Sequence, residues 1–80
     1  MEVTVTVRRR PNIADPAGAA VSKALRDLGY DAVAKVRIDR TIALTIDGED
    51  PIAVEERVRE MCERLLANPV MEDYHIEVGP

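Results

Sequence analysis

The chain has 80 residues, of which 46% are apolar and 32% charged, a composition typical of one small folded domain and not of a disordered segment. Its 11 basic and 15 acidic side chains give a formal charge of -4, which argues against nucleic acid as the main partner. A single cysteine excludes an internal disulfide, and no apolar run is long enough for a signal peptide or a membrane span, so we expect a cytoplasmic protein with no membrane contact whose residues 1–80 form one domain.

The first expected element is a strand near the N-terminus. Val3, Val5 and Val7 alternate with polar residues, which predicts a strand with one apolar face. This strand runs into three arginines at positions 8–10, whose guanidinium groups suit phosphate or an acidic partner. Three adjacent strand residues cannot share one face, so a solvated strand end explains them equally well.

The first helix is expected to start at Asp15-Pro16. Asp15 has the position of a side-chain cap, and Pro16 has the first helical position, where its missing N–H leaves no hydrogen bond unmade. Gly29 fits the left-handed residue that ends a helix. The spacing of the apolar residues predicts one stripe that faces the core, formed by Ala17, Val21, Ala24, Leu25 and Leu28.

Two short alternating runs follow the first helix. They are Val36–Ile38 and Ile42–Ile46, with Asp39-Arg40 between them, and a β-hairpin is the simplest interpretation. The turn has no glycine, although Asp39 tolerates a positive φ better than most residues do.

The second helix has the same start signal as the first. Asp50-Pro51 repeats the order of cap and proline, and the acidic segment 47–50 lacks the ligand spacing of a calcium loop, so we assign it to a turn and a helix cap. Pro69 ends the helix, and the last strand covers Tyr74–Val78. The apolar face of this helix is expected to comprise Val54, Val58, Met61, Leu65 and Leu66.

The order of the elements predicts an α+β, ferredoxin-like βαββαβ fold with an antiparallel sheet and two helices on one face. The two helical stripes share a spacing, which indicates two similar halves. The other face of the sheet carries no aromatic side chain on which a nucleic-acid base could stack, and its small and β-branched residues suit packing on another sheet or exposure. Its expected members are Thr4, Thr6, Lys35, Arg37, Thr41, Ala43, Thr45, His75 and Glu77.

The residue chemistry indicates a subunit or binding module without an active site. Cys62 lies beside the apolar stripe, so we expect a buried, unreactive thiol, and with His75 as the only histidine neither a Cys/His couple nor a zinc site is expected. Residues 11–14 offer no glycine-rich phosphate loop of the acylphosphatase kind. An ACT-like small-molecule sensor remains an alternative function, because Arg10–Ala14 has the position of the ligand loop in such domains.

Three segments carry a resemblance that covers nearly the whole chain. Glu60–Tyr74, Asp15–Gly18 and Leu28–Tyr30 are similar to the PurS family, the small subunits of the multi-subunit phosphoribosylformylglycinamidine synthase. The chain departs from the family pattern at three places. Ala14 and Ala17 stand where a larger and a polar residue, respectively, are usual. Asn12 stands where glycine is usual, and asparagine is the next best residue for a left-handed turn. Asp39-Arg40 stands where Gly-Lys is usual.

The resemblance implies a non-catalytic role in purine biosynthesis. In the family, a glutaminase subunit (PurQ) releases ammonia, and a synthetase subunit (PurL) uses ATP and magnesium to convert formylglycinamide ribonucleotide to formylglycinamidine ribonucleotide. PurS-like proteins join these two subunits and associate with themselves, as dimers or tetramers. We therefore expect no catalytic residue, cofactor or metal in this chain. The candidate partner contacts are loop and strand-end residues, namely Arg8, Arg10, Asn12, Asp15, Arg37, Arg40 and Asn68.

Overall fold

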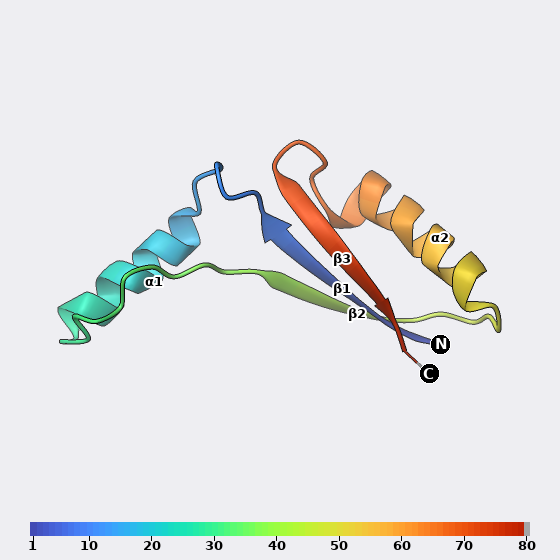
Figure 1. Cartoon of the computed structure of the whole chain (residues 1–80), viewed down its shortest axis with the longest axis horizontal. Coiled ribbons are helices and arrows are strands. Elements are labelled where there is room, and N and C mark those ends of the chain that lie inside the picture. Colours follow the sequence, from blue (N-terminus) through green and yellow to red (C-terminus); the bar gives the residue numbers. More distant parts are fainter. Residues whose placement is uncertain (80) are drawn as a thin grey trace.

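A computed structural model describes residues 1–79 and shows an α+β protein with three strands and two α-helices (Figure 1). The class and the antiparallel sheet predicted from the sequence are confirmed. The elements in chain order are β1 (Glu2–Arg9), α1 (Pro16–Asp27), β2 (Arg40–Thr45), α2 (Pro51–Met61), the π-helical turn η1 (Cys62–Leu66) and β3 (Glu72–Val78).

The sheet has the strand order β2-β1-β3, and both pairings are antiparallel. Val5 of the central strand lies opposite Ile42 on one side and Ile76 on the other, so the apolar residues of the three strands share one face. On the opposite face Thr41 and His75 are exposed, as the alternation predicts.

The core lies between this apolar face and the second helix. Val3 and Val5 of β1 are completely buried, and so are Val58 of α2 and Cys62 of η1, while Val54 is only 4% exposed. α2 lies beside the sheet, next to β3 (Figure 1). Since no phenylalanine or tryptophan is present, the core is aliphatic, and its stability depends on close packing of small side chains.

The predicted helix starts are confirmed. A carboxylate oxygen of Asp15 accepts a hydrogen bond from the Gly18 backbone N–H at 3.0 Å, and Asp50 accepts one from Ile52 at 3.0 Å. Both helices have proline in the first turn. Gly29 has a φ of 100°, the left-handed conformation expected after α1.

The end of the second helix differs from a regular α-helix. The Ala67 N–H donates to the Cys62 carbonyl at 3.0 Å, an i to i−5 bond that adds a residue to the turn. Val54, Val58 and Cys62, each four residues apart, form the buried row. The wider turn after Cys62 shifts the positions that follow, and Leu65, predicted on the core face, is 82% exposed. The helical segment still ends just before Pro69, as predicted.

The predicted β-hairpin is wrong. Residues 33–39 form no strand, and only Arg40–Thr45 pairs with β1, so the sheet has three strands and not four. The Ile38 N–H donates to the Asp15 carboxylate at 2.9 Å, which holds this segment against the start of α1. Lys35 and Arg37, expected on the free face of the sheet, consequently lie outside it.

Within one chain, α2 alone covers the sheet. α1 extends beyond the end of the sheet, alongside the segment 33–39 (Figure 1). Its buried residues are Gly18 and Ser22. A Cβ at Gly18 would lie 2.3 Å from the Val36 carbonyl oxygen, so only glycine lets the helix approach the segment 33–39 this closely. The predicted apolar stripe is left open, with Val21 39% and Leu28 74% exposed.

The molecule is consequently long and thin. Its extents are 50 × 26 × 14 Å and its radius of gyration is 16.1 Å, whereas a compact chain of this length has a radius of about 12 Å. No helix among residues 1–79 is long and apolar enough to cross a membrane.

Candidate functional site

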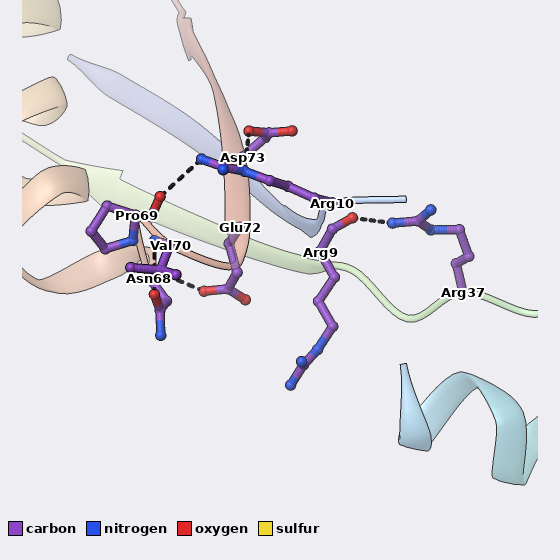
Figure 2. A network of polar contacts seen from close by, with 8 residues as sticks. All are labelled: Arg9, Arg10, Arg37, Asn68, Pro69, Val70, Glu72 and Asp73. Carbon is purple, nitrogen blue, oxygen red and sulfur yellow. Dashed lines mark hydrogen bonds and ion pairs between the residues drawn. The ribbon is translucent and has the colours of Figure 1, made fainter. Parts of the chain in front are cut away.

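The seven predicted contact residues gather where the sheet meets α1. β1 ends there, β2 and β3 begin there, and the loops on both sides bring the remaining residues to the same region. Figure 2 shows Arg10, Arg37 and Asn68 in this region. The structure divides most of the seven residues into a group that faces β3 and a group that faces α1. Arg10, Arg40 and Asn68 form the first group, and Asn12, Asp15 and Arg37 form the second, while Arg8 bonds to Asp39, just before β2.

Arg10 ties the end of β1 to the loop before β3. Its Nε lies 3.2 Å from a carboxylate oxygen of Asp73, and its Nη2 donates to the Pro69 carbonyl at 2.8 Å (Figure 2). Arg8 pairs with Asp39 at 3.0 Å, with 61% of the arginine side chain exposed. An ion pair so exposed to water stabilises the fold little, so Arg8 remains available to a partner.

Glu72 is the hub of the β3 side. One of its carboxylate oxygens accepts hydrogen bonds from the Asn68 backbone N–H at 2.8 Å and from Arg40 Nη2 at 3.1 Å. The Asn68 hydrogen bond, followed by that of Arg40, holds the pKa of Glu72 below its ordinary value. Asn68 Oδ1 accepts from the Val70 N–H at 3.0 Å, and Arg40 also donates to the Leu66 carbonyl at 3.0 Å. Arg40 and Asn68 thus organise the connection from η1 to β3.

Asp15 is the hub of the α1 side. Its carboxylate accepts from the N–H groups of Gly18 and Ile38, and these bonds, with the nearby charges of Arg9 and Arg37, hold the pKa of Asp15 below its ordinary value. Arg37 donates to the Arg9 carbonyl (Figure 2). Its Nε is buried and has no hydrogen-bond partner within residues 1–79.

Asn12 lies exposed in the loop between β1 and α1. Over residues 1–79 no residue other than glycine has a positive φ, so the prediction of a left-handed turn at Asn12 is wrong, and Asp39 does not use that conformation either. Because Ile13 N–H donates to the Arg10 carbonyl at 2.9 Å, this loop closes in an ordinary turn that asparagine adopts without strain.

The carboxylates of Glu72 and Asp73 were missed in the sequence reasoning. In the antiparallel register Arg8 lies opposite Asp73, and Arg9 lies opposite Glu72. A basic strand end and an acidic strand start of similar length would have indicated this pairing, since opposite charges across neighbouring strands attract.

The environments of the cysteine, the histidine and a tyrosine show no catalytic arrangement among the described residues. Cys62 is completely buried, and this burial, together with the charge of Glu63, raises the pKa of its thiol. His75 is exposed and lies 3.5 Å from Glu77. Tyr74 donates to Glu63, a bond that raises the pKa of the tyrosine hydroxyl. In the part of the chain that the structure describes, no three potential ligands are grouped so as to hold a metal ion.

Fold and site together define a small α+β protein whose polar side chains mainly connect its own elements, and whose first helix carries an uncovered apolar stripe. The comparisons with known proteins agree with this class. The family model for PurS, phosphoribosylformylglycinamidine (FGAM) synthase, matches residues 2–80. The chain belongs to this family.

Individual relatives support the assignment. The chain is 43% identical to the PurS subunit of phosphoribosylformylglycinamidine synthase from Synechocystis sp. over 74 residues, 92% of this chain and 74% of that protein. Its structure is similar to that of Bacillus subtilis PurS, with a TM-score of 0.89, 43% identity and coverage of 99% and 98% of the two chains. A chain of PurLQS from Thermotoga maritima matches with a TM-score of 0.85, 33% identity and coverage of 95% and 93%. These matches favour the synthase subunit over the ACT-like sensor.

Proposed function

We propose that this protein is a non-catalytic, self-associating subunit of FGAM synthase that holds a PurQ-like glutaminase against a PurL-like synthetase. In this role it serves purine biosynthesis in the cytoplasm. Ammonia released from glutamine passes to the synthetase within the assembly, while ATP and magnesium are bound by the synthetase and not by this chain.

The observation that carries the proposal is the match over residues 2–80 to PurS, together with the similarity to a chain of the Thermotoga maritima PurLQS structure. The name of that structure combines the three subunits of the assembly that we propose for this chain.

Self-association is supported by the uncovered surface of the chain itself. Val21 and Leu28 on α1 are exposed, and on the helix-covered face of the sheet Ile42 and Leu44 of β2 are only partly buried. In a compact α+β fold a second helix would lie beside α2 over these strands. The α1 stripe of a second copy has the apolar character to fill that position. By twofold symmetry each copy would then cover the sheet of the other.

The direct test uses three purified subunits. We expect glutamine-dependent formation of formylglycinamidine ribonucleotide to require this protein in addition to the glutaminase and the synthetase. Ammonia-dependent synthesis by the synthetase serves as the control for its own activity. Unchanged glutamine-dependent activity without this protein would disprove the role as an adaptor.

A further inference from the structure

The clearest concave feature outside the sheet is a cleft between α1, the loop that precedes it and the segment before β2. The cleft has a volume of about 560 Å³, within the range of small-molecule sites. Ser22 and Arg26 of α1 line one wall, Lys35 and Arg37 line another, and the loop 11–14 closes an end. The cleft is therefore built from three separate parts of the chain.

The charge of this cleft is opposite to that of the whole chain. Arg26, Lys35 and Arg37 line it, and Asp15 is the one carboxylate among its lining residues. Both oxygens of Asp15 already accept backbone N–H groups. Within residues 1–79, none of the three cations forms an ion pair, whereas the neighbouring Arg10 does. A chain with a net charge of -4 thus places three cations and one carboxylate, a net charge of +2, around one concavity.

Arg37 gives this cluster a defined donor. The arginine is half-buried, and its Nη2 is used by the Arg9 carbonyl, but its buried Nε–H has no acceptor in residues 1–79. A buried donor without an acceptor is unfavourable, because it has lost its water and gained no protein partner. An oxygen-rich anion in the cleft would neutralise the surrounding charges, and it would supply the missing acceptor if the Arg37 side chain turned its Nε–H toward the cleft.

We propose that this cleft binds the phosphate group of a small molecule. Guanidinium groups match the oxygens of a phosphate in paired hydrogen bonds, and two arginines with a lysine suit a dianion better than a single carboxylate. The phosphate can belong to free inorganic phosphate or to a phosphorylated sugar or nucleotide, and binding experiments distinguish these sources.

The cleft is independent of the surface proposed for self-association. α1 turns by about 100° per residue, which places Ala19, Ser22 and Arg26 on the side roughly opposite Val21 and Leu28. A ligand in the cleft and a second copy on the apolar stripe can therefore be bound at the same time.

The test is calorimetry on the full chain at low salt with inorganic phosphate, ribose 5-phosphate and adenosine monophosphate. We expect saturable binding of at least one of them. The double variant R26Q/K35Q should weaken it by on the order of tenfold or more, as for the loss of charge-assisted contacts. The control K23Q/R57Q removes the same two residue types from surfaces outside the cleft and should change affinity less than about twofold.

The relative affinities identify the source of the phosphate. Tighter binding of a phosphorylated compound than of inorganic phosphate assigns the cleft to that compound, and equal affinities assign it to the free ion. Amide NMR shifts confined to residues such as Ala14, Ala19 and Ala34 would support the location. The proposal is overturned by the absence of saturable binding up to about 10 mM of all three compounds, or by equal weakening in the two double variants.

Discussion

Glu72 connects the start of β3 to the end of the second helical segment, and its replacement by glutamine measures how much this connection stabilises the fold. The carboxylate accepts bonds from the Asn68 N–H at 2.8 Å and from Arg40 at 3.1 Å, and its side chain is only 10% exposed. E72Q keeps the shape and one acceptor oxygen but removes the negative charge. The bond from the Asn68 N–H then becomes a neutral one, and the Arg40 guanidinium keeps its charge but loses the opposite charge of its acceptor, so we expect a loss of about 1–3 kcal/mol in total.

The assay is urea or thermal unfolding at one fixed protein concentration, since self-association also contributes to the measured stability. For a chain of this size each kcal/mol corresponds to a shift of about 4–8 °C in Tm. The control is E77Q, which removes the same charge from the same strand. Glu77 is 73% exposed and lies 3.5 Å from the likewise exposed His75, so E77Q should change the free energy of unfolding by less than about 0.5 kcal/mol.

The dependence on pH gives a second measurement of the same group. The pKa of Glu72 is lower in the folded chain than in the unfolded one, so the unfolded state binds a proton first as the pH falls. Its stabilisation is complete above the unfolded pKa of about 4.3 and is lost as the pH falls through the lower folded value. E72Q should flatten the stability profile in this acidic range. A profile and a Tm equal to those of E77Q would refute the role of Glu72 as a hub.

Three further substitutions or reactions test other parts of the structure. V21E places a charge on the open stripe of α1 and should weaken self-association by on the order of 100-fold in light scattering, while K23E on the polar side of the helix should not. The buried thiol of Cys62 should react with a thiol reagent on the order of 100-fold slower in the native protein than in urea, and equal rates would contradict its burial. G18A should lower the free energy of unfolding by about 1–3 kcal/mol, since its Cβ would meet the Val36 carbonyl oxygen, and an unchanged Tm would show that this packing is loose.

The features predicted correctly from the sequence are those set by neighbouring residues. Asp15-Pro16 and Asp50-Pro51 cap their helices through contacts two or three residues away, so the sequence contains the whole interaction. The apolar face of β1 follows from the alternation of Val3, Val5 and Val7, which leaves one way to bury all three.

The features missed depend on contacts between residues far apart in the chain or on a local turn that has no sequence signal. Val36–Ile38 has the alternation of a strand, but the Ile38 N–H bonds to Asp15, 23 residues earlier, and not to a neighbouring strand. The periodicity of the sequence identifies the apolar face of α1, but it does not indicate which element covers that face. Leu65 was misplaced because one π-type turn changes the phase of the helix, and no local residue signalled it.

The candidate residues on the β3 side and those on the α1 side should respond differently to mutation. The reason is that the former bond to the chain itself, whereas the latter face a cleft. Arg40 and Asn68 bond to the chain itself, so their loss should first lower the stability of the connection to β3 and only then affect a partner. Asn12 and Arg37 face a cleft, and Arg37 has a donor that the chain leaves unused. Binding energy to another molecule is available only from groups that folding has not already satisfied. We therefore expect recognition at this junction to be concentrated on the α1 side, with the β3 side as its rigid support.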